Sequence, residues 1–148
     1  MYEHTQRSPR LLLLLGVAAG GVVVALALPA TRVLTFGPRL TLAASALSLF
    51  ASGLTFSSLT IRIADGRLAW HFGAGLFGKS VPLDEIVSAE PTTITWMDGW
   101  GIHLTRRGWL YNDAGRQAVL ITMHDGKRFM LGTDEPAALV QALRGPAL

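Results

Sequence analysis

The sequence predicts a membrane protein of the α+β class, in which an N-terminal two-helix transmembrane hairpin precedes a β-rich domain. Three observations support this fold class. Half of the 148 residues are apolar and only 16% are charged, whereas an ordinary soluble domain has about a quarter charged residues. From residue 11 to residue 59, the only charged side chains are Arg32 and Arg39. Beyond residue 60 the apolar residues recur with the period of two that is typical of strands.

The first apolar segment, residues 11–28, has no polar side chain and is predicted as transmembrane helix 1. A helix rises 1.5 Å per residue, so a run of this length nearly crosses a hydrocarbon core of about 30 Å. Residues 1–10, which precede it, are interpreted as a basic N-terminal tail. A cleaved signal peptide ending at the Ala-Leu-Ala of residues 25–27 is the alternative. The length of the run and the second apolar segment favour the transmembrane helix.

The second apolar segment, residues 40–59, is uncharged and rich in Ser and Thr, and is predicted as transmembrane helix 2. Residues 29–39 contain two prolines and one glycine, and are predicted as the connecting turn. Small residues recur at helical spacing in both segments, which predicts a close contact between the two helices. These residues are Gly16, Gly20, Ala44, Ser48 and Ser52.

Arginines near the helix ends predict the orientation in the membrane. Four lie on the domain side of the helices and two lie in the connecting turn. The four are Arg7, Arg10, Arg62 and Arg67, and the two are Arg32 and Arg39. We therefore expect a multi-pass protein of the plasma membrane, with both termini and the domain in the cytoplasm.

The β domain is predicted from residue 60 to residue 148, with six or seven strands. Alternating apolar residues surround Asp65-Gly66 and Asp125-Gly126, and such dipeptides are typical of β-hairpin turns. Pro91 is expected to end one strand. Shorter strands are predicted at residues 81–83, 86–90, 101–105 and 109–111.

The chain is predicted to end in an amphipathic helix at about residues 134–144. Glu135 and Pro136 suit its first turn, and Gly145-Pro146 would stop it. A strongly bent antiparallel β-sheet or barrel, closed at one end by this helix, would bury the apolar pattern of the domain.

Short motifs between residues 58 and 145 occur in a characteristic order. They are Val-Pro-Leu-Asp-Glu-Ile at 81–86, Gly-Trp-Gly-Ile at 99–102, Tyr-Asn at 111–112 and Gly-Thr-Asp-Glu-Pro at 132–136. In this order and spacing, together with the helix hairpin, the chain resembles small bacterial membrane proteins that carry a pleckstrin-homology-like (PH-like) domain. His103 stands where such proteins often have an arginine. The resemblance implies a PH-like domain and a bacterial inner membrane, and it implies no particular activity.

The distribution of charge excludes a nucleic-acid-binding domain. Residues 1–59 contain four arginines and one glutamate, whereas residues 60–148 contain nine basic and nine acidic residues. The basic excess therefore flanks the helices, and the domain lacks the net positive charge that phosphate backbones require. The first hairpin loop has Asp65 between Arg62 and Arg67, so no phosphoinositide site is expected there.

Gly73 to Ser80 fits the pattern G-x-x-x-x-G-K-[ST] of phosphate-binding loops. Such a loop requires a helix that begins at the Lys-Ser pair, but Val81-Pro82-Leu83 follows here. A glycine-rich hairpin loop is therefore favoured, and nucleotide binding through this segment is the least favoured alternative.

Catalytic and metal-binding patterns are missing from the sequence. There is no cysteine and no G-x-S-x-G motif, and His71, His103 and His124 fall on different predicted strands. We therefore expect no catalytic residues, no metal ligands, no cofactor and no enzymatic activity.

Trp96, Trp100, Trp109 and Tyr111 form the candidate interaction patch, because indole rings suit both protein contacts and membrane interfaces. Trp100, which lies between two glycines, is expected to have a structural role. The favoured function is a non-enzymatic, membrane-anchored interaction or scaffold module that contacts a protein partner or a second copy. A membrane-tethered barrel that binds a lipid or a small molecule is the alternative.

Overall fold

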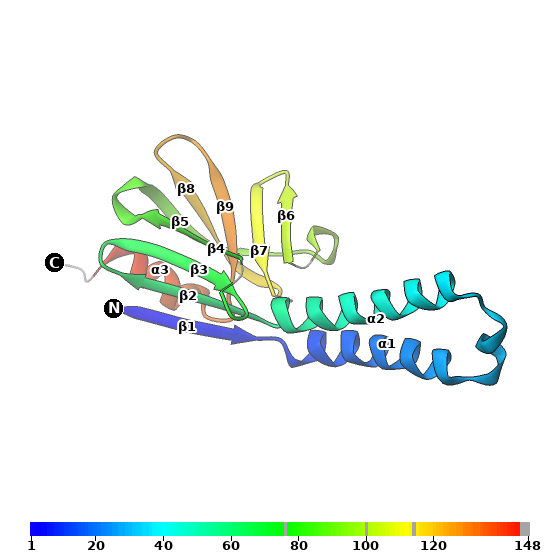
Figure 1. Ribbon diagram of the computed structural model, residues 1–148. Helices are drawn as coiled ribbons and strands as arrows, with labels where there is room; N and C mark the ends of the chain where they lie inside the picture. Colours follow the sequence, from blue (N-terminus) through cyan, green and yellow to red (C-terminus); the bar gives the residue numbers. More distant parts are fainter. Residues whose placement is uncertain (76, 100, 114, 146–148) are drawn as a thin grey trace.

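The structure is a computed structural model that describes residues 1–75, 77–99, 101–113 and 115–145. Two long helices lie side by side and extend from one side of a β-rich domain (Figure 1). They are α1 (Pro9–Ala27) and α2 (Phe36–Phe56), joined by the 3-10 turn η1 (Pro29–Val33). By length and composition both helices can cross a membrane, and few of their residues are buried within the protein. An α+β chain with two candidate spanning helices, followed by β-sheets, is thus confirmed.

The contact between α1 and α2 differs from the one predicted. A Cβ at Gly53 would lie 3.3 Å from the Cβ of Leu15, so the helices approach closely there. At Gly16 or Gly20 a Cβ would meet no atom of the other helix within 4 Å. The remaining predicted contact residues line a shallow groove formed by α2 alone, and the prediction for the whole set is wrong. These residues are Ala44, Ser48 and Ser52.

The N-terminal segment is a strand, so its interpretation as a tail is wrong. Strand β1 (Tyr2–Arg7) pairs antiparallel with β2 (Ser58–Ala64). At the end of the ladder, where Arg7 lies opposite Ser58, both strands continue directly into the helices. The Ser8 N–H donates a hydrogen bond of 2.7 Å to the Ser57 carbonyl oxygen at this junction. The strand pair and the helix pair therefore form one continuous ribbon.

A four-stranded sheet is built on this ribbon in the order β1-β2-β3-β4. Strands β3 (Arg67–Phe72) and β4 (Phe77–Pro82) are antiparallel to their neighbours. The hairpin predicted at Asp65-Gly66 is confirmed, and both residues have the positive φ that such a turn requires. A short 3-10 turn η2 (Leu83–Glu85) follows β4, so the strand predicted at residues 81–83 ends at Pro82.

The second sheet has five strands in the order β5-β8-β9-β7-β6. Their bounds are β5 (Ile86–Thr93), β6 (Gly101–Thr105), β7 (Gly108–Asn112), β8 (Gln117–Met123) and β9 (Arg128–Gly132). The β8–β9 hairpin is confirmed, but β7 and β9 are parallel, which an all-antiparallel sheet does not allow. The 3-10 turn η3 (Trp96–Asp98) precedes β6. The described strands make two sheets and not one closed barrel, so the barrel prediction is wrong.

Pro91 lies within β5, opposite Val119, and does not end the strand. Strand β5 is an edge of its sheet, and an edge strand tolerates a residue without an N–H because one side needs no ladder hydrogen bonds.

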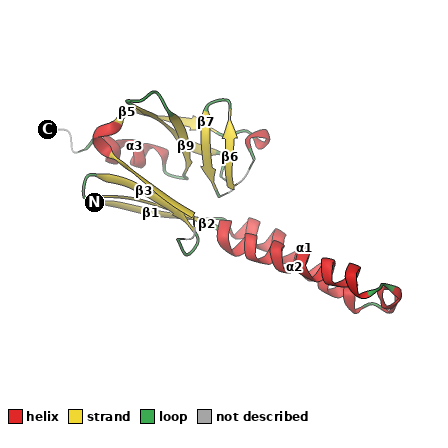
Figure 2. Cartoon of the chain, turned by 45° about the horizontal axis from the view of Figure 1, so that its top comes forward, coloured by secondary structure: helices red, strands yellow, loops and turns green. Residues whose placement is uncertain are grey.

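The two sheets pack face to face, and α3 (Pro136–Arg144) covers one end of the space between them (Figure 2). Fully buried Leu59, Phe72 and Leu131 come from both sheets, and Leu139 of α3 packs against them. The predicted C-terminal helix is thus confirmed, and it forms one wall of a groove whose opposite wall includes β1.

Candidate functional site

The described side chains of the predicted aromatic patch differ in how deeply they are buried. Trp109 and Tyr111 lie two residues apart on β7, so their side chains share one face of the sheet. Tyr111 is only 4% exposed, with its ring 5.2 Å from that of Trp70, whereas Trp109 is 45% exposed. Trp100 lies outside the described residues, as does the side chain of Trp96. Tyr111 is therefore a core residue, and Trp109 is the described member of the patch that reaches the surface.

The second half of the segment that fits the phosphate-loop pattern is strand. Gly78, Lys79 and Ser80 lie within β4, so no helix begins at the Lys-Ser pair. The Lys79 ammonium lies 5.5 Å from the centre of the Tyr111 ring and 5.8 Å from that of Trp109. The Ser80 hydroxyl accepts a hydrogen bond of 2.8 Å from the Arg67 guanidinium. Both side chains thus contact other side chains of the protein.

The histidines of the domain do not form a metal site among the described residues, where no group of three metal-ligating side chains gathers. His4, outside the predicted set, has carboxylate neighbours. Its Nε2 donates a hydrogen bond of 2.5 Å to Asp134, and its Nδ1 lies 3.5 Å from Glu135. This cluster attaches β1 to the segment that begins α3. The sequence alone does not reveal this cluster, because His4 and Asp134 are 130 residues apart and residues 1–10 are predicted as a tail.

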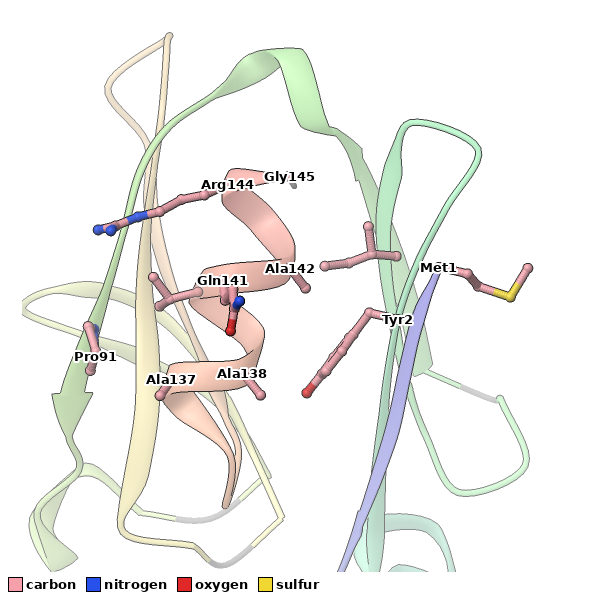
Figure 3. A pocket seen from close by; sticks show the side chains of 11 residues that line it. Met1, Tyr2, Pro91, Ala137, Ala138, Gln141, Ala142, Arg144 and Gly145 are labelled. Atoms are coloured by element: carbon pink, nitrogen blue, oxygen red, sulfur yellow. The ribbon is translucent and has the colours of Figure 1, made fainter. Parts of the chain in front are cut away.

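A groove of about 740 Å³ lies between β1 and α3. Figure 3 shows Tyr2 reaching from β1 toward α3, whose Ala138 and Ala142 lie on the side of the helix nearest to it. Ile63 and Pro91 complete the apolar lining from the two sheets. The volume lies in the range of small-ligand pockets, about 300–1,000 Å³.

The polar groups of the groove are few. Gln141 and Arg144 contribute the amide and the guanidinium of α3, whereas the hydroxyl oxygen of Tyr2 is buried. Burial raises the pKa of the Tyr2 phenol, and the nearby carboxylates of Glu135 and Asp134 raise it further. The phenol therefore stays protonated at neutral pH. Apolar walls with a few fixed polar groups are suited to binding.

Both strands that flank the groove, β1 and β5, are edges of their sheets. An edge strand presents unpaired backbone N–H and C=O groups, to which an extended segment of another chain can add. Nothing in the sequence marks these residues as a site, since the groove combines Tyr2, Pro91 and α3 from three distant segments.

No protein-family model matches the chain, and no curated protein matches its sequence. The resemblance to membrane proteins with a PH-like domain therefore stays a prediction. The geometry of the helices and of the groove between β1 and α3 is the basis for inferring a function.

Proposed function

We propose that this protein is a non-enzymatic, membrane-anchored interaction module of the bacterial inner membrane, with its β domain in the cytoplasm. The observation that carries the proposal is the continuous ribbon of β1-α1 and α2-β2. Two covalent connections and the Ser8–Ser57 hydrogen bond fix the direction in which the domain faces relative to the helices. A single flexible linker would leave that direction free.

The helices support membrane anchoring through their surfaces. Large apolar side chains such as Leu13, Val17 and Leu47 are each more than 60% exposed in the isolated chain. Water makes such a surface unfavourable, whereas hydrocarbon accommodates it. At 19 and 21 residues, α1 and α2 are about 28 and 32 Å long, which matches the hydrocarbon core.

The domain itself is proposed to be a divergent PH-like domain. Two packed sheets and a C-terminal helix at one end support this assignment. The parallel β7–β9 pair is a departure from it. A segment of a protein partner, or of a second copy, is proposed to occupy the groove between β1 and α3, where apolar walls adjoin two free strand edges.

Site-specific labelling tests the anchoring and the sidedness. The chain has no cysteine, so single cysteines can replace Phe36 at the helix turn and Val87 on β5, which are both exposed. With an impermeant maleimide on intact cells, we expect labelling of Phe36→Cys alone, and of Val87→Cys only after permeabilisation. Labelling of Val87→Cys alone would place the domain outside the cell. Recovery of both variants in the soluble fraction would refute membrane anchoring.

Cross-linking tests the groove. A photo-reactive residue at Gln141 is expected to yield an adduct of defined mass in cells, equal to twice the chain if the partner is a second copy. The same probe at Val87, which lies outside the groove, is the control. Ala138→Phe adds a ring to the groove wall and should abolish the adduct. An adduct of equal yield from Val87, or one unaffected by Ala138→Phe, would contradict groove binding.

The volume and apolar lining of the same groove favour a second candidate, the binding of a lipid or a small molecule. A ligand that raises the melting temperature of the parent but not of Ala138→Phe would support this alternative. Substrate turnover that depended on a groove residue would overturn the proposal of a non-enzymatic role.

A further inference from the structure

A second cavity, of about 560 Å³, lies where the domain meets the two helices. We call it the junction cavity. Its walls are the end of β1, the beginning of β2, the first turns of α1 and the β3–β4 loop at Gly73. Its polar lining consists of Thr5, Arg7, Ser8, Ser57, Ser58 and Thr60.

The chemistry of the junction cavity is that of an anion site. Five hydroxyl groups and one guanidinium line it, and none of its lining residues carries a carboxylate. The Thr5 and Thr60 hydroxyls are hydrogen-bonded to each other at 2.9 Å, which leaves that pair one proton to donate, and the Ser57 hydroxyl donates to the Leu54 carbonyl oxygen. Two other exposed cations of the domain are paired, Arg62 with Glu3 and Lys127 with Asp125. Within the described part of the chain, Arg7 has no such carboxylate partner. A guanidinium that lacks an internal partner is free to bind phosphate oxygens with two parallel hydrogen bonds.

The shape of the cavity is fixed by close packing at Gly73. This residue has a positive φ of 48°, and a Cβ there would lie 2.8 Å from the Thr55 carbonyl oxygen. The Gly73 N–H donates to the Ser58 carbonyl oxygen at 3.0 Å. The β3–β4 loop is thereby held against the last turn of α2, so the cavity is present without a ligand.

The position of the cavity depends on the proposed function, because the helices define the membrane only if they span it. In that arrangement the uncharged part of α1 begins at Leu11, one turn beyond Arg7, so the cavity lies at the level of the lipid headgroups. Leu12 of α1 forms its apolar wall on the helix side, and hydroxyl groups form its wall on the domain side. This polarity gradient matches that of a phospholipid between its phosphate and its acyl chains.

We propose that the junction cavity binds the phosphate of an anionic phospholipid from the surrounding bilayer. The Arg7 guanidinium pairs with the phosphate, and the Ser58 hydroxyl and the remaining proton of the Thr5–Thr60 hydroxyl pair donate to phosphate or glycerol oxygens. Leu12 lies beside the upper part of an acyl chain. This site differs from the first hairpin loop at Asp65, which lies at the opposite end of β2.

The test is native mass spectrometry of the full chain in detergent, titrated with phosphatidylglycerol or phosphatidylcholine. We expect preferential binding of phosphatidylglycerol, weakened about tenfold by Arg7→Gln, which corresponds to the loss of charge-assisted hydrogen bonds. Arg62→Gln is the matched control, because Arg62 lies on the same face of the sheet, four residues along β2 from Ser58. Ser58→Ala should weaken binding less than Arg7→Gln, since it removes one neutral donor.

Equal weakening by Arg7→Gln and Arg62→Gln would show only general attraction to positive charge and would overturn the site. Equal binding of the two lipids would also overturn it. Competition by inorganic phosphate at the concentration of the lipid would support the phosphate chemistry but assign it to a soluble ion. Spin labels at Val23 and Leu47, in nanodiscs, test membrane anchoring separately from lipid binding at the junction cavity. If the labels are exposed to lipid and Arg7→Gln does not weaken phosphatidylglycerol binding, the junction site alone is refuted. Labels exposed to water would refute the proposed function.

Discussion

Replacing Gly108 by alanine tests the parallel pairing of β7 with β9. Gly108 begins β7 with a φ of 112°, and a Cβ added there would lie 1.9 Å from the carbonyl oxygen of Arg128 in β9. Gly126, in the β8–β9 turn, also has a positive φ, of 80°, but a Cβ there meets no atom within 4 Å. Both substitutions place a side chain on a backbone with positive φ, but only Gly108→Ala also creates a steric clash.

The expected cost follows from this difference. A non-glycine residue in such a backbone region costs about 1–3 kcal/mol, which is the whole effect expected for Gly126→Ala. In Gly108→Ala, β7 and β9 must separate locally by about 1.5 Å to restore an ordinary contact. Overpacking of this kind costs about 1–3 kcal/mol, and each weakened ladder hydrogen bond adds about 0.5–1.5 kcal/mol. Gly108→Ala should therefore lose about 2–5 kcal/mol more than Gly126→Ala, out of the roughly 5–15 kcal/mol typical of a domain.

Thermal unfolding of the full chain in detergent, followed by near-UV circular dichroism, reports the aromatic environment of the domain. Hydrogen exchange localises the effect, since the amides of Leu110 and Tyr111 should exchange faster in Gly108→Ala. Equal melting temperatures for Gly108→Ala and Gly126→Ala would refute the parallel register.

Three further predictions concern single side chains. Because the pKa of Tyr2 is raised, the folded phenol keeps its proton above the ordinary value of 10.0, where the unfolded phenol loses it. The free energy of unfolding should therefore fall as the pH rises past that value. Denaturant titrations of Tyr2→Phe should lack this part of the fall in stability. The Thr95 hydroxyl and backbone N–H lower the pKa of Asp98, with a smaller contribution from Arg107, so its stabilisation is present above the ordinary 3.8 and lost as the pH falls through the lowered value. Asp98→Asn should flatten the acid limb of the stability curve, and an unchanged limb would contradict this. Calorimetry with Mg-ATP should show no binding by the parent or by Lys79→Ala, because Lys79 lies in β4. Binding heat in the parent that disappears in Lys79→Ala would show that the segment from Gly73 to Ser80 binds nucleotide after all.

Local sequence patterns predicted the elements whose determinants are local. The apolar runs that became α1 and α2 need no distant partner to be recognised. The turns at Asp65-Gly66 and Asp125-Gly126 mark both hairpins locally, because a glycine, and at the first turn also an aspartate, adopts positive φ at low cost. The helix after Glu135 carries its own start and stop signals.

Features that depend on distant partners escaped prediction. Residues 2–7 contain one large apolar side chain, Tyr2, and their pairing with β2 arises because the helix hairpin brings Arg7 opposite Ser58. Pro91 is compatible with β5 only because that strand is an edge, which sheet order decides. The groove and the junction cavity likewise depend on segments separated by the whole hairpin. Trp109 and Tyr111 look equivalent in the sequence, and only the packing of the facing sheet distinguishes the exposed side chain from the buried one.

The ribbon formed by β1, α1, α2 and β2 has a consequence for biogenesis. The residues of β1 are synthesised about 50 residues before those of β2. Under the proposed membrane anchoring, the first strand would wait for its neighbour while the helices enter the bilayer. Packing of α1 against α2 then brings the two strand ends together, in place of the random search that closing so long a loop would otherwise need. Under the proposed anchoring, insertion into the membrane would be the step that starts folding of the four-stranded sheet. A chain that failed to insert would present unpaired strand edges, which quality-control proteases and aggregation both exploit.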